Sequence, residues 1–179
     1  MDNYLDQNQV IELAKAAIFG NREAFGSLYE IYALDMYKYA LSMCRNRFDA
    51  EDAVQETVIS VYKSIKSIRK PEKFKAYLFL SLSNTCKKIC KNRAEKEVPM
   101  QEIEAENTGT HGTGTEFDLS ITLKEALNTL DYDSREILVL SVVAGFTSKE
   151  IGKILNILPA TVRTKQKRAL EKVRKELES

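Results

Sequence analysis

The sequence predicts an all-α protein made of two small helical domains joined by a flexible linker, with a helix-turn-helix in the C-terminal domain. Three observations support this prediction. Apolar residues recur at intervals of three and four through residues 10–93 and again through residues 121–144, as they do on the buried faces of helices. A polar tract rich in Gly and Thr separates these two stretches. Near the C-terminus, the pattern of a short capped helix precedes that of a basic helix.

The N-terminal domain is predicted to span residues 1–95 and to contain four helices. Residues 10–19 form the first helix, which Gly20 and Asn21 end, and residues 23–44 form a longer one whose aromatic stripe belongs to the core. The third begins at Asp49, and the fourth covers residues 74–93. The fourth helix is expected to bury Phe74, Tyr77, Leu78, Leu82, Thr85 and Ile89.

The predicted third helix has two distinct faces. A stripe of valines points inward, while a second stripe aligns acidic and amide side chains with the apolar Ile59. The positive end of the helix dipole explains acids in a first turn, but it does not explain an apolar residue aligned with them. We therefore predict a protein-docking surface made of Asp49, Glu51, Asp52, Gln55, Glu56 and Ile59.

A basic connector, broken at Pro71, links the third helix to the fourth and contains Lys66, Arg69 and Lys73. On the fourth helix, an amide that can read a base edge accompanies three cations that can hold phosphates: Asn84, Lys87, Lys88 and Lys91. Tyr77 and Phe79 are candidate platforms for stacking unpaired bases, although such aromatics more often belong to the core. Phe79 is expected to be the freer of the two, because Tyr77 lies on the predicted buried stripe.

Residues 96–119 are predicted to be a flexible acidic linker, because their periodicity stops and the Gly/Thr tract is too polar to bury anything. The C-terminal domain, residues 120–179, is expected to begin with a stripe of Leu123, Leu127 and Leu130. Residues 131–134 are predicted to form a turn and residues 135–144 a central apolar helix, which Gly145 ends.

Residues 146–170 have the pattern of a helix-turn-helix. Thr147 and Glu150 form a capping box, and Gly152 suits a close approach of another helix to the backbone. Asn156 tolerates a left-handed turn, and Pro159 suits the first turn of a second helix.

The second helix of this motif is basic and amphipathic. One face is expected to be buried and holds Val162, Ala169, Leu170, Val173 and Leu177. The opposite face and its shoulders carry Arg163, Thr164, Lys165, Lys167 and Arg168. These features predict a helix that enters a major groove of DNA, the alternative being an ordinary helical hairpin with a solvated basic face.

The charge of the chain is segregated along its length. The net charge of +1 is the sum of −5 for residues 1–62, +8 for residues 63–95, −5 for residues 96–119 and +3 for residues 120–179. Two basic zones separated by acidic ones favour a protein that touches DNA at two places and another partner with its acidic surface.

Several classes of function are disfavoured by what the sequence lacks. The polar N-terminus does not resemble a signal peptide and no apolar run is long enough for membrane insertion, so a cytoplasmic protein is expected. Cys44, Cys86 and Cys90 suit reduced thiols; a metal site that combines them with His111 is conceivable, but without a CxxC motif neither a metal nor a cofactor is expected. The only His lies in the linker and no catalytic motif is present, so an enzyme is not expected.

Four segments resemble the extracytoplasmic-function (ECF) sigma factors of the bacterial sigma-70 family. They are DAEDAVQE at residues 49–56, FKAYLFLSLSN at 74–84, GFTSKEI at 145–151 and TVRTKQKRAL at 161–170. The likeness covers both domains in order and leaves out the linker. Tyr77 stands where the family usually has Trp, and Asn156 and Ala160 replace two frequent glycines.

The resemblance implies a sigma factor that binds core RNA polymerase, directs it to promoters and has an anti-sigma factor as a partner. It implies that the face of residues 49–59 docks on the polymerase clamp. It also implies that residues 66–73 and the face of residues 77–91 recognise the minus-ten element, and that residues 163–168 read the minus-thirty-five element. The alternative is a stand-alone helix-turn-helix regulator, which would act as a dimer and bind duplex DNA unaided.

Overall fold

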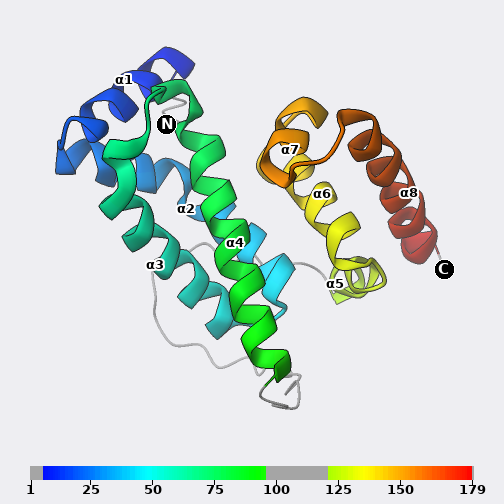
Figure 1. The fold of residues 1–179 in the computed structure, drawn as a ribbon. Helices are drawn as coiled ribbons and strands as arrows, with labels where there is room; N and C mark the ends of the chain where they lie inside the picture. The colour runs from blue at the N-terminus through cyan, green and yellow to red at the C-terminus, as the bar shows by residue number, and fades with distance from the viewer. Residues whose placement is uncertain (1–5, 96–120, 179) are drawn as a thin grey trace.

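The computed structural model describes residues 6–95 and 121–178, and within these ranges every regular element is a helix (Figure 1). In chain order the elements are α1 (Gln7–Ile18), α2 (Arg22–Cys44), α3 (Arg47–Ser64), η1 (Ile65–Ser67), η2 (Pro71–Lys73), α4 (Phe74–Glu95), α5 (Ile121–Asn128), α6 (Tyr132–Val142), α7 (Ser148–Leu155) and α8 (Pro159–Glu178). The predicted all-α fold with two helical domains is confirmed. The predicted linker, residues 96–119, lies outside the described residues.

The N-terminal domain is organised around α2, which packs against α1, α3 and α4. Leu28, Met36 and Ala40 repeat along α2 with helical periodicity and are fully buried. Gly20, with φ of 99°, lets the chain reverse between α1 and α2 in a backbone conformation that residues with side chains rarely adopt. The two long helices α3 and α4 lie side by side and present their outer faces to solvent.

The start of α3 differs from the prediction. The helix begins at Arg47, and the side chain of Asn46 caps it by accepting a hydrogen bond of 3.0 Å from the backbone N–H of Asp49. Asp49 therefore lies in the first turn, whereas Glu51 and Asp52 lie beyond it. The N-cap of this helix is thus an amide side chain, that of Asn46.

The C-terminal domain is organised around α6, whose residues Ile137, Leu138, Val139 and Leu140 are all buried. The helix begins at Tyr132, so the predicted turn at residues 131–134 is wrong. Asp131 is its N-cap and accepts a hydrogen bond of 2.9 Å from the backbone N–H of Ser134. A strong N-cap residue and the start of a turn have the same sequence signal, which accounts for the error.

The helix-turn-helix forms as predicted. Thr147 and Glu150 make a capping box at the start of α7, Asn156 adopts φ of 54°, and Pro159 is the first residue of α8. A Cβ at Gly152 would lie 2.7 Å from the carbonyl oxygen of Ile157, so the close approach predicted there comes from the backbone of the turn.

The buried face of α8 is narrower than predicted. Val162, Ala169 and Val173 are buried, but Leu170 and Leu177 are each 47% exposed. Leu170 follows the buried Ala169 directly and precedes the buried Val173, so it is exposed because it lies on another side of the helix, where it lines a shallow groove.

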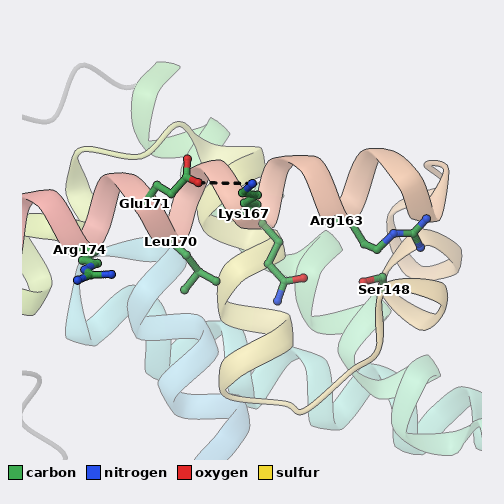
Figure 2. Close-up of a pocket in the computed structure, with 7 residues that line it drawn as sticks. Ser148, Arg163, Lys167, Leu170, Glu171 and Arg174 are labelled. Carbon is green, nitrogen blue, oxygen red and sulfur yellow. Dashed lines mark ion pairs between the residues drawn. The ribbon is translucent and has the colours of Figure 1, made fainter.

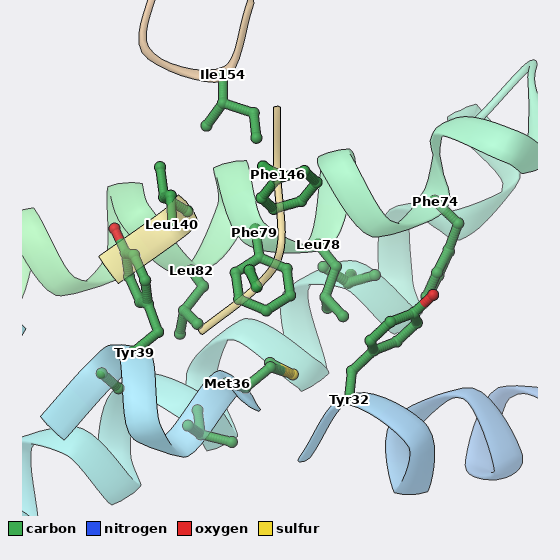
Figure 3. Close-up of a cluster of buried hydrophobic side chains, with 14 of the residues drawn as sticks. Tyr32, Met36, Tyr39, Phe74, Leu78, Phe79, Leu82, Leu140, Phe146 and Ile154 are labelled. Carbon is green, nitrogen blue, oxygen red and sulfur yellow. The ribbon is translucent and has the colours of Figure 1, made fainter. Parts of the chain in front are cut away.

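The two domains pack against each other through α2 and α4 on one side and α6 and α7 on the other. Phe79 of α4 meets Phe146 edge-to-face with ring centroids 5.5 Å apart, and it meets Tyr39 of α2 in the same way at 6.0 Å (Figure 3). One apolar cluster runs without interruption from α2 and α4 to Leu140, Phe146 and Ile154. The described part of the chain thus has a core shared between its domains.

Candidate nucleic-acid and protein interfaces

The outer face of α3 combines acidic and apolar side chains that are open to solvent. Asp52, Gln55 and Glu56 are exposed, and Ile59 is 55% exposed. Phe48 lies one helical turn before Asp52, is 63% exposed and extends the same stripe. Phe48 was not among the predicted docking residues because the helix was expected to begin at Asp49.

Two of the predicted docking residues also form ion pairs with α4. Asp49 forms an ion pair with Arg93 of α4, and both side chains are 23% exposed. Glu56 pairs with Lys88 of α4 at 2.7 Å, while Glu51 pairs with Arg47 within α3 at 2.9 Å. Asp49 thus lies at the α3–α4 seam, and the freely accessible part of the acidic face runs from Phe48 through Asp52 to Ile59.

The basic connector presents its cations outward. Lys66, Arg69 and Lys73 are exposed, whereas the neighbouring Ile65 and Ile68 are buried and anchor the segment. The two short 3-10 helices and the residues between them therefore hold three cations at the end of the bundle where α4 begins.

The predicted minus-ten face of α4 is exposed at Asn84, Lys87, Lys88 and Lys91. Its cations turn to different partners: Lys88 pairs with Glu56 of α3, Lys91 lies 3.8 Å from Glu95, and Lys87 pairs with Glu136 of α6 at 3.0 Å. The face thus spans the gap between α3 and the C-terminal domain.

The aromatic platforms differ from the prediction. Phe79 is fully buried in the shared core, so it is not free to stack on a base. Tyr77 is half-buried, and its hydroxyl lies 2.9 Å from the hydroxyl of Ser64. The prediction for Phe79 was wrong because the C-terminal domain covers its side of α4. The periodicity of α4 alone predicts that this side is exposed.

Glu136 is the residue around which the two domains meet. It is 1% exposed, and its carboxylate accepts hydrogen bonds from the hydroxyls of Tyr39, at 2.8 Å, and Ser83. Lys87 completes the cluster from the solvent side, with its side chain 43% exposed. Burial, together with the adjacent Glu136 carboxylate, raises the pKa of the Tyr39 phenol well above its usual value, so Tyr39 remains a donor.

Lys75 makes a second contact between the domains. Its ammonium donates to the carbonyl oxygen of Ala144, at the end of α6, and lies 5.0 Å from the ring centroid of Phe146. Burial lowers the pKa of Lys75, while the carboxylates of Asp35 and Glu150 act in the opposite direction. Neither Glu136 nor Lys75 was identified from the sequence, because no pattern marks which residues two domains will share.

The predicted minus-thirty-five residues lie along the outer side of α8. Arg163, Thr164, Lys167 and Arg168 are exposed, and Lys165 is half-buried with an ion pair of 3.2 Å to Asp133 of α6. A shallow groove beside them is lined by Ser148 of α7 and by Arg163, Lys167, Leu170, Glu171 and Arg174 (Figure 2). Lys167 lies 3.9 Å from Glu171 within the helix, which leaves its ammonium open to solvent.

The three cysteines lie where α2 and α4 meet. Hydrogen bonding with Cys86 and burial raise the pKa of the Cys44 thiol, and Cys44 and burial raise that of Cys90. His111 lies outside the described residues, and among the described residues no group of three or more His, Cys, Asp and Glu is placed to hold a metal ion. None of the helices in the described ranges has the length and apolar character needed to span a bilayer.

Comparison with known proteins identifies both domains. Residues 28–95 match the family model for sigma-70 region 2, and residues 120–173 match the model for sigma-70 region 4. The ECF RNA polymerase sigma factor SigW of Bacillus subtilis is 29% identical over 174 residues, which cover 88% of this chain and 91% of SigW. RNA polymerase sigma factor CarQ of Myxococcus xanthus is 28% identical over 159 residues, 87% of this chain and 90% of CarQ.

Solved structures share the fold. CnrH, solved in complex with the cytosolic domain of CnrY, aligns with a TM-score of 0.72 and 23% identity over 97% of this chain and 98% of CnrH. RpoE of Bartonella quintana, solved in complex with the anti-sigma factor NepR, aligns with a TM-score of 0.71 and 23% identity over 86% of this chain and 96% of RpoE. With regions 2 and 4 present in order, and with SigW and CarQ matched over nearly their full length, the chain belongs to the ECF sigma factors of the sigma-70 family.

Proposed function

We propose that this sigma factor divides its work among three exposed faces of its two domains. An acidic and apolar face on α3 contacts core RNA polymerase, a cationic face on the connector and α4 contacts the minus-ten element, and a cationic face on α8 contacts the minus-thirty-five element. The presence of these three chemically distinct faces on separate elements is the observation that carries the proposal.

The polymerase-binding face consists of Asp52, Gln55, Glu56 and Ile59, with Asp49 and Glu51 beside them and Phe48 added from the structure. Ile59 and Phe48 supply apolar area that would be removed from water on docking, and the carboxylates select a basic partner surface. This arrangement is typical of a protein interface with an apolar centre and a charged rim.

The DNA-binding faces combine phosphate contacts with groups that read bases. Lys66, Arg69, Lys73, Lys87, Lys88 and Lys91 are proposed to hold the minus-ten strand, with Asn84 and Tyr77 toward its bases. On α8, Arg163, Thr164, Lys165 and Lys167 are proposed to position the helix in the major groove. Arg168 is proposed to reach a base edge there, since a guanidinium can bond guanine in bidentate fashion.

The same proposal assigns the chain a cytoplasmic location, beside the polymerase, and action by binding rather than by catalysis. CnrH and RpoE were each solved with a protein partner, CnrY and the anti-sigma factor NepR. We infer that an anti-sigma factor likewise controls this chain.

The test is transcription from fragmented genomic DNA by core polymerase, with and without this protein, followed by sequencing of the transcript starts. The expected result is a set of new start sites preceded by shared minus-ten and minus-thirty-five elements. A gel shift with duplex DNA that needs no polymerase, together with unchanged start sites, would contradict the proposal and favour a stand-alone regulator.

A further inference from the structure

The closed packing of the two domains places a buried carboxylate of one domain on the predicted DNA-binding face of the other. Glu136 reaches from α6 to Lys87 on α4, and the same carboxylate accepts hydrogen bonds from Ser83 and Tyr39. All three partners are donors, so they bind the ionised form of the side chain.

The three donors of this cluster suit an oxyanion. An ammonium and two hydroxyls that converge on a carboxylate offer the same donors that would hold a phosphate oxygen of a DNA strand. Lys87 lies beside the exposed Asn84 and one turn from Lys91, so the occupied site is continuous with the face proposed for the minus-ten strand.

A second contact closes the same surface nearer the start of α4. There Lys75 donates to the carbonyl of Ala144, and Phe146 covers Phe79. Two cations of α4 thus contact acceptors of the C-terminal domain: Lys75 contacts the carbonyl oxygen of Ala144, and Lys87 contacts the carboxylate of Glu136.

The interface between the domains is not saturated with hydrogen bonds. Arg135, next to Glu136, is 4% exposed, and its Nε and Nη1 meet no acceptor among the described residues. The guanidinium lies 5.8 Å from the ring centroid of Tyr132. Burying a charge without full hydrogen bonding costs free energy, and this cost opposes the closed packing.

We propose that Glu136 is an internal competitor for promoter DNA: in the closed form its carboxylate occupies Lys87, Ser83 and Tyr39, and a phosphate of the minus-ten strand engages Lys87 only after α6 has moved away. We call the contact of Glu136 with Lys87, Ser83 and Tyr39 the latch. The competitor role rests on the proposed function, whereas the latch is a property of the free chain. If a latch leaves only a tenth of the molecules open, it lowers the apparent affinity for DNA about tenfold.

The first measurement is small-angle X-ray scattering of the free chain, which reports opening without any ligand. Glu136→Gln is expected to increase the radius of gyration, because a neutral amide oxygen holds the ammonium less strongly than a carboxylate does. Lys87→Met breaks the same pair from the solvent side and is expected to have the same effect with little risk to folding. Glu125→Gln removes an equal charge from an exposed position of α5 and is expected to leave the radius unchanged.

The second measurement is fluorescence anisotropy with a labelled random single-stranded 20-nucleotide pool at low salt. Glu136→Gln is expected to bind it about tenfold more tightly than the unmodified chain, and adding Lys87→Met should remove most of this gain. Glu125→Gln controls for the change in net charge.

The outcomes separate the latch from the proposed function. Unchanged radii of gyration for both Glu136→Gln and Lys87→Met would overturn the latch. Expansion of Glu136→Gln without tighter DNA binding would overturn the competitor role. An equal gain in DNA affinity in Glu125→Gln would overturn it as well. Transcription by the unmodified chain with core polymerase tests the proposed function separately. If that transcription failed, an expansion measured by scattering would still support the latch.

Discussion

Glu56 and Lys88 show how an exposed ion pair can serve binding more than stability. Their side chains are 48% and 61% exposed, and the two atoms that meet lie 2.7 Å apart. An exposed pair of this kind contributes at most about 1 kcal/mol to folding, because water and salt screen the attraction. The carboxylate is therefore available to a partner at little cost to the fold.

Glu56→Lys is expected to weaken the capture of core polymerase while changing the free energy of unfolding by no more than about 1 kcal/mol. The reversal places a cation within the acidic face of α3. Pull-down of core enzyme and urea denaturation measure the two effects. Glu12→Lys, an equal reversal on α1, is the control, and a Glu56→Lys protein that captures polymerase as well as this control would contradict the docking face.

Arg168→Ala is expected to reduce transcription from cognate promoters without unfolding the protein. If the guanidinium makes a bidentate contact with guanine, its removal costs about 1–3 kcal/mol of binding. Arg174→Ala removes the same charge from a residue that pairs with Glu178, at 2.7 Å, and should have a smaller effect. Equal losses in the two variants would mean that Arg168 supplies only charge.

Among the elements, the turn between α7 and α8 is the one that fixes the geometry of the DNA-binding helix. The backbone of the turn sets a requirement at three positions: space at Gly152, a left-handed conformation at Asn156 and a first helical turn at Pro159. All three residues were identified from the sequence for that reason. The faces of α8 were predicted less well, since helical periodicity alone does not show how wide the covered face of a helix is. Leu170 and Leu177 were assigned to the buried face but are each 47% exposed, while Ala169 and Val173 are buried.

Gly152→Ala is expected to destabilise the protein by about 1–3 kcal/mol, because its Cβ would lie 2.7 Å from the backbone oxygen of Ile157. For a chain of this length, each kcal/mol lowers the melting temperature by about 2–4 °C. Gly26→Ala is the matched control. Gly26 lies within α2 with nothing within 4 Å of the added Cβ, so there the same change should stabilise by about 0.5–1 kcal/mol. A melting temperature unaffected by Gly152→Ala would show that the turn can relax.

The capping box of α7 predicts a dependence of stability on pH. Hydrogen bonds from the backbone N–H and the hydroxyl of Thr147 lower the pKa of Glu150 below its usual value of 4.5. A lowered pKa contributes stability that is present above the unfolded value and is lost as the pH falls through the folded value.

The stability difference between the unmodified chain and Glu150→Gln should therefore shrink as the pH falls below about 4.5, when the carboxylate becomes protonated. Urea denaturation at a series of pH values measures it. Asp131→Asn should behave in the same direction, because Ser134 lowers the pKa of Asp131 in the same way. A difference that grows in acid would contradict this account of the cap.

At the scale of the whole molecule, the sequence predicts both domains but not how they meet. Each helix face was assigned as buried or exposed from its own periodicity, and this holds for Leu28 or Val162, which pack inside one domain. Phe79 and Glu136 depend on a neighbour more than 50 residues away in sequence, so their burial had no local signal. Most side chains of the predicted polymerase and DNA faces are exposed, because their burial does not depend on the other domain, and their roles stay predictions.

Phe146→Ala is expected to destabilise the protein by about 3–5 kcal/mol, the usual cost of removing a buried Phe. Because Phe146 packs on Phe79 between the domains, its loss should also split one thermal transition into two. Calorimetry measures both effects, and Leu28→Ala, within the N-terminal domain, should destabilise without the split. A single transition in Phe146→Ala would show that other contacts couple the domains.

The thiols between α2 and α4 are natural probes of how often the N-terminal domain unfolds. Alkylating reagents attack the thiolate, and raised pKa values keep Cys44 and Cys90 protonated at neutral pH while Cys86 is wholly enclosed. Iodoacetamide should therefore modify the native chain slowly and the unfolded chain quickly. The rate of labelling then measures how often the N-terminal bundle comes apart, without any added probe.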